Sequence, residues 1–270
     1  MKIDCHNHTT FSPDAAQTVD EIAAEAKRLG IGYLALTEHL DLGFPNDKRP
    51  EGEPSFDYLV TEKYFDEIET AKKKYGIEIA AGIEAGYTDD SVGETAKELA
   101  RLPFEYVINS VHICHGLDCY WNGYFDGLTK KEAYTEYIAA VRKSLDAPYR
   151  YDAVGHFGYI ARPAPYEHKI MMFREFAAEI DDVLSVIIKK DKILEVNTST
   201  GLSGGLCIPD LSILERYYAL GGRLINIGSD SHRTGRVSHN YDAVGDAVKS
   251  IGFREWAVVR NGKIETEAID

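Results

Sequence analysis

Seven short apolar segments alternate with helical segments along the 270 residues, and this alternation limits the possible folds more than any other feature. The apolar segments lack regular polar positions, which is typical of parallel strands buried on both faces. Seven alternating units predict a closed α/β barrel, and an open doubly wound sheet is the alternative. The predicted strands cover residues 1–8, 31–39, 77–86, 104–112, 151–157, 192–199 and 223–232.

Helix signals lie between these strands. Thr18 stands three residues before Glu21, and Thr129 stands three residues before Glu132, so both pairs match the capping box that begins a helix. Residues 41–58 are rich in proline, glycine and charge, which predicts a long loop of the kind that often forms a lid or binding loop. We predict helices over residues 18–30, 57–75, 129–145, 170–190, 210–220 and 241–250.

Composition limits the partners. The formal net charge of −14 argues against non-specific binding to nucleic acid or anionic membranes, because both require a basic surface. No apolar stretch approaches the roughly 20 residues that span a bilayer, and no signal peptide is recognisable. The cysteines form no CxxC pair, so we expect free thiols in the reducing cytosol. They are Cys5, Cys114, Cys119 and Cys207.

Residue types that bind metals gather at the ends of the predicted strands. The carboxyl ends of barrel strands form one face, so these side chains are expected to meet in one cavity. A single histidine of this kind is usually a hydrogen-bonded core residue, but six of the nine histidines lie at these ends. The candidate ligands are His6, His8, Asp14, His39, Glu84, His112, His156, Asp230 and His232.

Nine candidate ligands are too many for one ion. Burying these charges together would cost several kcal/mol for each group unless they were neutralised. Divalent cations provide that neutralisation, and imidazole and carboxylate are common ligands of zinc, manganese and iron. A carboxylate bridges two ions through its two oxygens, so the set predicts two or three metals.

The segments DCHNHTTFSPD, TEH, GIEAG, SVH, VGHF and GSDSH follow in this order. The ordered set resembles the polymerase-and-histidinol-phosphatase (PHP) superfamily of metal-dependent phosphoesterases over essentially the whole chain. The resemblance implies a single domain over residues 1–270 with a distorted, TIM-like (β/α)7 barrel. TEHLDLGF, FEYVINSVH and YDAVGHFGYIARP resemble the histidinol-phosphate phosphatase branch. That branch implies hydrolysis of L-histidinol phosphate, a small phosphomonoester, in histidine biosynthesis.

The resemblance also implies three divalent ions, which are zinc, manganese or iron. By analogy, the first ion is held by His6, His8, Glu84 and Asp230. Glu84 bridges to the second ion, whose other ligands are His112 and His156. The third ion is held by Asp14, His39 and His232.

Hydrolysis of a phosphomonoester requires an activated water and positive charge on the phosphoryl oxygens. We predict that Asp230 also positions the attacking water or accepts its proton. Arg162 follows the fifth strand, and its guanidinium matches paired phosphate oxygens, with a surface salt bridge as the alternative role. Asn197 and Ser199, at the end of the sixth strand, are predicted to donate hydrogen bonds to phosphate or to a substrate amine.

Several further residues have weaker signals. Arg233 and Arg236 are candidates for phosphate binding, but solvated loop positions are favoured for them. The branch often has an arginine after the sixth strand, whereas this chain reads NTSTGLSGGLC there. Glu195 is predicted to orient a histidine, and Asp4 is predicted to support the ligands that follow it.

Three other functions stay open. The first is a PHP-family phosphoesterase that acts on another small phosphomonoester or a nucleotide. The second is a metal-dependent amidohydrolase, which typically carries a modified lysine on a barrel strand; no lysine lies at a predicted strand end here. The third is a non-catalytic domain, which is disfavoured because such domains lose ligands and none of the nine is missing.

Overall fold

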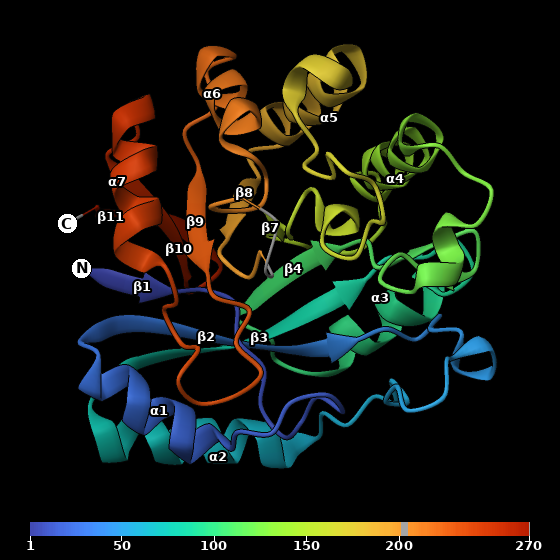
Figure 1. Ribbon diagram of the computed structural model, residues 1–270. Coiled ribbons are helices and arrows are strands. Elements are labelled where there is room, and N and C mark those ends of the chain that lie inside the picture. Colours follow the sequence, from blue (N-terminus) through green and yellow to red (C-terminus); the bar gives the residue numbers. More distant parts are fainter. Residues whose placement is uncertain (201–204, 270) are drawn as a thin grey trace.

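A computed structural model describes residues 1–200 and 205–269. In this part of the chain, seven parallel strands form a nearly closed barrel in the order β1-β2-β3-β4-β7-β8-β9 (Figure 1). Backbone hydrogen bonds from Cys5 N to Ile227 O (2.8 Å) and from Asp230 N to His6 O (2.7 Å) join the last strand to the first. The predicted TIM-like α/β barrel of seven strands is therefore confirmed.

Each barrel strand falls on one of the seven predicted segments, but most strands are shorter than the segment. The polar residues at several segment ends therefore lie just beyond the sheet; β1, for example, ends two residues before His6. The strands are β1 (Lys2–Asp4), β2 (Ile31–Leu40), β3 (Glu78–Gly86), β4 (Tyr106–Ser110), β7 (Ala153–Val154), β8 (Ile193–Asn197) and β9 (Ile225–Gly228).

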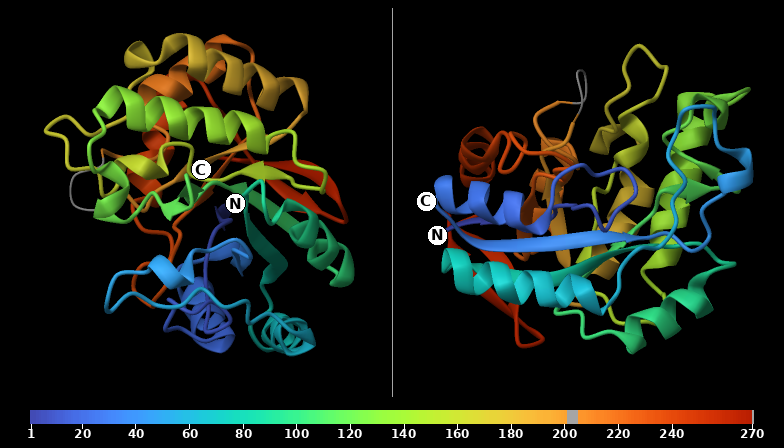
Figure 2. Two further views of the ribbon diagram at one scale, coloured as in Figure 1. Left: turned by 90° about the vertical axis from the view of Figure 1, so that its right-hand side faces the viewer. Right: turned by 90° about the horizontal axis from the view of Figure 1, so that it is seen from below.

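The helices surround the sheet, and α1 and α2 lie side by side against it (Figures 1 and 2). Both predicted capping boxes are present, with Thr18 accepting from Glu21 N and Thr129 accepting from Glu132 N. Helix α3 was not predicted, although Val92, Ala96 and Leu99 recur at helical spacing and pack, partly buried, against the core. The helices are α1 (Val19–Arg28), α2 (Glu62–Tyr75), α3 (Val92–Arg101), α4 (Lys130–Ser144), α5 (Ala177–Lys189), α6 (Leu211–Ala219) and α7 (Tyr241–Ile251).

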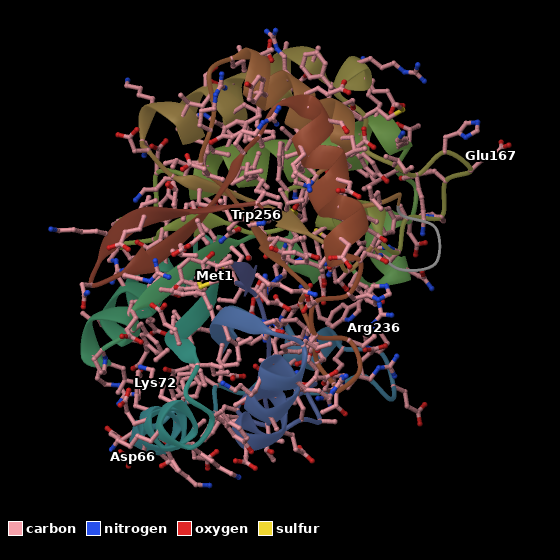
Figure 3. The ribbon with its side chains drawn as sticks, turned by 90° about the vertical axis from the view of Figure 1, so that its left-hand side faces the viewer. Met1, Asp66, Lys72, Glu167, Arg236 and Trp256 are labelled. Atoms are coloured by element: carbon pink, nitrogen blue, oxygen red, sulfur yellow. The ribbon has the colours of Figure 1, made fainter. Side chains whose placement is uncertain are left out.

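Two antiparallel hairpins lie outside the barrel. Strands β5 (Ile113–Cys114) and β6 (Leu117–Asp118) follow β4. Strands β10 (Glu255–Arg260) and β11 (Lys263–Ala268) form the C-terminal hairpin, in which Trp256 is labelled in Figure 3. The hydroxyl of Tyr33, near the start of β2, donates to Val259 O (2.9 Å). This hairpin therefore covers the amino ends of the strands and leaves the carboxyl ends open.

The predicted long loop joins β2 to α2 and contains one short 3-10 turn, η1 (Asn46–Lys48). All four cysteines are buried and unpaired, as predicted. Among residues 1–200 and 205–269, no helix combines the length and the apolar character that crossing a membrane requires.

Candidate metal centre

A cavity of about 680 Å³ opens at the carboxyl ends of the barrel strands. Seven of the nine candidate ligands line it, and His6 and His8 are completely buried beneath it. The candidate ligands come from distant parts of the chain. The first and the last of them, His6 and His232, are 226 residues apart in sequence. Their convergence follows from the parallel barrel, in which every strand delivers its carboxyl end to the same face.

The first group contains His6, His8, Glu84 and Asp230. The Nε2 atoms of His6 and His8 lie 3.1 Å apart. Glu84 Oε2 is 3.3 Å from His6 Nε2 and 3.5 Å from His8 Nε2. Asp230 Oδ1 approaches the same two nitrogens at 3.7 and 3.4 Å. Four donor atoms therefore surround one small volume.

Glu84 joins the first group to a second one through its other oxygen. Its Oε1 is 2.8 Å from His156 Nε2 and 3.3 Å from His112 Nε2. Those two nitrogens are 3.2 Å apart. Ser110 Oγ donates to Glu84 Oε1 (2.6 Å) and fixes the orientation of the carboxylate. Glu84 is thus placed as a bridge between two sets of imidazoles.

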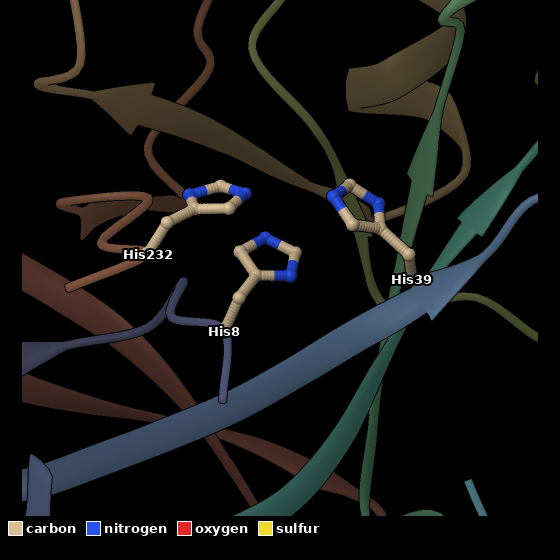
Figure 4. A group of neighbouring side chains, drawn as sticks. All are labelled: His8, His39 and His232. Carbon is tan, nitrogen blue, oxygen red and sulfur yellow. The ribbon is translucent and has the colours of Figure 1, made fainter. Parts of the chain in front are cut away.

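The third group lies at the opposite side of His8. Asp14 Oδ2 is 3.0 Å from His232 Nε2 and 3.6 Å from His39 Nε2. The ring of His8 stacks against those of His39 and His232, with centroid distances of 4.2 and 4.3 Å, and the centroids of the latter two lie 5.8 Å apart (Figure 4). His8 is therefore shared in space between the first and the third group.

The donor set fits divalent cations. Three overlapping sets of residues each bring their imidazole or carboxylate atoms within 4.8 Å of one another, which is close enough to share one ion. The sets are His8 with His39 and His232, His6 with His8 and Asp230, and His39 with Glu84 and His112. Asp14 Oδ1 is buried and has no hydrogen-bond partner, and His39 Nδ1 lies 3.2 Å from both Asp41 Oδ2 and Glu84 Oε2 without forming a hydrogen bond. Unpartnered buried polar atoms are costly, and a bound cation would satisfy such donor sets.

Without bound ions, protons neutralise part of this cluster. Burial lowers the pKa of the His112 imidazole, but Asp41 and Glu84 outweigh burial and raise it to about 10, so a cation that binds there would displace a proton.

Burial and the neighbouring imidazoles of His39 and His232 lower the pKa of His8 to about 3, so its ring is neutral at pH 7. Burial by itself would raise the pKa of Glu84, but the adjacent His6 and His112 hold it well below its usual range. Neutral imidazole and ionised carboxylate are the forms that bind metals.

Buried carboxylates orient the ring nitrogens that point away from the cluster. Glu195 Oε1 lies 2.5 Å from His6 Nδ1, and Glu195 Oε2 accepts from His156 N (2.5 Å). Asp41 Oδ1 lies 2.9 Å from His112 Nδ1. These contacts leave the Nε2 atoms of His6 and His112 directed at the cluster.

Two of the candidate ligands have strained backbones. His156 has φ = 21° and Asp230 has φ = 52°, and both values are unusual for residues other than glycine. Such strain costs about 1–3 kcal/mol for each residue and gathers at functional sites. The fold therefore holds both side chains in orientations that an ordinary strand end would not give them.

Arg162 lies beside this cluster at the wall of the cavity. Its Nη2 donates to Asp230 Oδ2 (2.8 Å) and to Asn197 Oδ1 (2.9 Å), whereas its buried Nε has no partner. Asn197 is completely buried behind Arg162 and does not line the cavity, and Ser199 does line it. Asn197 thus contacts both Arg162 and Asp230, the latter through Nδ2 at 3.4 Å.

The other candidates of the sequence lie elsewhere. Neither Arg233 nor Arg236 is among the described residues that line the cavity. Asp4 accepts from Ser229 N and Ser238 N, both at 2.8 Å, so it holds the segment after β9. In the segment NTSTGLSGGLC, residues 201–204 lie outside the described part of the chain.

Sequence reasoning missed three cavity or support residues. Asp41 stands two positions after His39. Side chains two residues apart on a strand point to the same face, so the sequence already indicated that Asp41 lies on the side of the cluster. Asp118 and Lys169 line the cavity from segments without a readable pattern. Lys169 Nζ donates to Arg162 O (2.5 Å), and no carboxylate oxygen of the described residues forms an ion pair with it. It adds positive charge beside Arg162.

Comparisons with known proteins agree with this geometry. A PHP domain match covers residues 4–199. The probable histidinol-phosphatase of Clostridium acetobutylicum is 32% identical over 243 residues, which are 89% of this chain and 90% of that protein. The histidinol-phosphatase of Lactococcus lactis subsp. lactis is 29% identical over 276 residues, with 98% and 96% coverage.

A solved structure is similar over the full length. The crystal structure of histidinol phosphate phosphatase from Lactococcus lactis subsp. lactis, complexed with zinc, L-histidinol and phosphate, superimposes with a TM-score of 0.83. The two chains are 28% identical, and the match covers 98% of each. The PHP domain match spans more than half of the chain and agrees with these relatives. The chain belongs to the PHP domain family, in its histidinol-phosphatase branch.

Proposed function

We propose that this protein is a histidinol-phosphatase, which hydrolyses L-histidinol phosphate to L-histidinol and phosphate with the help of divalent metals. The observation that carries the proposal is the cavity at whose base the three ligand groups lie beside Arg162. The Lactococcus lactis relative, which holds zinc, L-histidinol and phosphate, supports the same substrate.

We propose three ions with the ligands grouped as the distances above suggest. Zinc is our first choice, because the relative's structure contains it. When bound, the ions supply a water of lowered pKa and positive charge for the phosphoryl oxygens. The proposed groups are His6, His8, Glu84 and Asp230; Glu84, His112 and His156; and Asp14, His39 and His232.

Arg162 and Asp230 are the proposed catalytic residues of the chain. Arg162 is tethered through Nη2, so its unpartnered Nε and its Nη1 can donate to phosphoryl oxygens. Asp230 accepts from Arg162 through Oδ2 and faces the imidazoles through Oδ1. We propose that it orients the attacking water or accepts its proton. Ser199 and Lys169, on the same wall, are proposed to bind the phosphate as well.

A second group of residues that line the cavity suits a cationic leaving group. Phe44, Phe56 and Trp121 pack together there, with centroid distances of 4.3 and 5.5 Å from Phe44 to the other two rings. Asp118 is 5% exposed, and its Oδ1 accepts from Tyr120 N (2.7 Å). Burial raises the pKa of Asp118 to about 6, so it is ionised at pH 7. Aromatic faces beside a carboxylate bind organic ammonium ions.

The testing experiment is phosphate release by the zinc-loaded protein. We expect kcat/KM for L-histidinol phosphate to exceed the values for other small phosphomonoesters and nucleotides by several orders of magnitude. Slow turnover of all substrates alike would contradict the substrate and favour a PHP-family phosphoesterase with another substrate. Loading the metal-free protein with zinc, manganese or iron in turn, followed by metal analysis, tests the number and identity of the ions.

Two further predictions from the sequence stand as proposals. The first is that residues 1–270 form one domain. The second is a cytosolic location, for which the four free, buried cysteines are the supporting observation. The acidic net charge of −14 supports a small-molecule substrate rather than nucleic acid or a membrane.

A further inference from the structure

Ser12 is a buried residue between β1 and α1 that contacts the candidate metal centre from behind. Its side chain is 1% exposed. Its Oγ lies 2.6 Å from Glu38 Oε2, 3.2 Å from His8 Nδ1 and 3.0 Å from His39 N. One hydroxyl thus touches a buried carboxylate and two segments that carry candidate ligands.

The contacts of Glu38 fix the direction of these hydrogen bonds. Thr9 N donates to Glu38 Oε2 (3.0 Å), and Thr9 Oγ1, which itself accepts from Phe11 N, donates to Glu38 Oε1 (2.7 Å). Both carboxylate oxygens therefore act as acceptors, and Ser12 gives its only proton to Glu38. The two lone pairs of Ser12 Oγ can then only accept hydrogen bonds, and one of them accepts from His39 N.

The remaining lone pair of Ser12 faces His8 Nδ1, so that nitrogen must carry a proton. A neutral imidazole has one protonated nitrogen and one lone pair. The lone pair of His8 therefore lies on Nε2, the atom that faces Glu84 and Asp230. The opposite tautomer would direct an N–H at the cluster and leave His8 unable to bind a metal there.

We propose that Ser12 and Glu38 are positioning residues that hold His8 in the tautomer with Nδ1 protonated. The proposal rests on the metal-ligand role proposed above for His8. His6 and His112 have a carboxylate directly at Nδ1, whereas His8 reaches its carboxylate through a hydroxyl.

The strand geometry explains the intervening serine. Neighbouring side chains on β2 point to opposite faces, so Glu38 lies on the side away from the cluster that His39 faces. Glu38 therefore contacts the segment behind His8, and Ser12 spans the gap between them. Because Ser12 also accepts from His39 N, it connects the backbone of β2 to the ring of His8.

The experiment compares zinc affinity of the full-length protein by competition with a chelator of known affinity. The variants are S12A, which removes the hydroxyl, and S12T, which keeps it. The control is S144A: Ser144 is equally buried, accepts from Asn109 Nδ2 and donates to Val141 O, and touches none of the nine candidate ligands. Loss of an outer partner of a metal ligand typically costs 10–100-fold in affinity.

We expect S12A to weaken the binding of at least one zinc ion by about 10–100-fold, with S12T and S144A close to the unmodified protein. Equal zinc affinity in S12A and the unmodified protein would overturn the proposal. An equal loss in S12A and S144A would overturn it too, because general destabilisation would then be the cause. If the unmodified protein bound no zinc, the ligand role of His8 itself would fail, which is a separate outcome.

Discussion

At the residue scale, the cavity wall carries both signs of charge. Tyr159 lies between them, because its hydroxyl donates to Asp118 Oδ1 (3.4 Å) and the Arg162 guanidinium lies 5.2 Å from its ring centroid. Arg162 and Lys169 are neighbours in the cavity lining. Among the described residues, Asp230 forms an ion pair with Arg162, and no carboxylate forms one with Lys169. Asp118 lines the same cavity, and no cationic side chain among the described residues forms an ion pair with it. An ester with an anionic phosphate and a cationic alcohol would match both groups.

Replacing Asp118 by asparagine tests the cationic end. We expect D118N to lower kcat/KM for L-histidinol phosphate by about 10–100-fold, because a hydrogen bond to a charged group contributes about 1.5–3 kcal/mol. Hydrolysis of 4-nitrophenyl phosphate, which has no ammonium group, is expected to change less than threefold. Steady-state kinetics with both substrates measure this difference. An equal loss with both substrates would show that Asp118 does not recognise the amine. The matched control is D126N, because Asp126 is exposed and does not line the cavity.

At the element scale, the ends of the barrel strands require small residues where ligands or their partners approach. Gly228 ends β9, and a Cβ there would lie 2.4 Å from His6 Cβ. Gly86 ends β3, and a Cβ there would lie 1.8 Å from Asp41 Oδ1. Both glycines thus leave room for the side chains that build or support the candidate metal centre.

The variant G86A tests this requirement. Its Cβ would displace the Asp41 carboxylate, which now lies 2.9 Å from His112 Nδ1, so we expect a 10–100-fold loss of phosphatase activity or metal affinity. Kinetics and metal analysis of the purified variant give the result. In the control G93A, the added Cβ meets no atom within 4 Å and lies in helix α3, so activity is expected to stay unchanged. Full activity of G86A would contradict the support role of Asp41.

At the scale of the whole molecule, the candidate metal centre joins the first and the last barrel strand. His6 and His8 follow β1, whereas Asp230 and His232 follow β9, and the two segments exchange backbone hydrogen bonds. Ions bound by both segments would hold the barrel closed at this seam. Metal binding should therefore contribute to global stability as well as to catalysis.

Removal of metal is expected to lower the melting temperature. At a free zinc concentration 100 times the Kd, one bound ion contributes about 2.7 kcal/mol, which corresponds to about 5–10 °C for a chain of this size. Calorimetry of the chelator-treated protein, before and after zinc is added back, measures this shift. An unchanged melting temperature in a sample shown to have lost its metal would contradict a stabilising role at the seam.

The barrel and its set of candidate ligands could be predicted from the sequence because both depend on short-range patterns. Buried parallel strands are continuously apolar, and Thr18 and Thr129 mark helix starts through contacts only three residues away. Parallel strands then carry the residues at their carboxyl ends to one face, so His39, Glu84 and His112 could be placed together without any knowledge of their distances.

Only the tertiary structure decided which groups support that set and which wall of the cavity they occupy. Glu38 and His39 are neighbours in sequence, yet one supports His8 from behind and the other faces Asp14. Asp118 and Lys169 reach the cavity from a hairpin and a loop whose positions no periodicity specifies. The physical reason is that a hydrogen bond or an ion pair depends on distances of about 3 Å between atoms, and chain folding alone sets those distances for residues far apart in sequence.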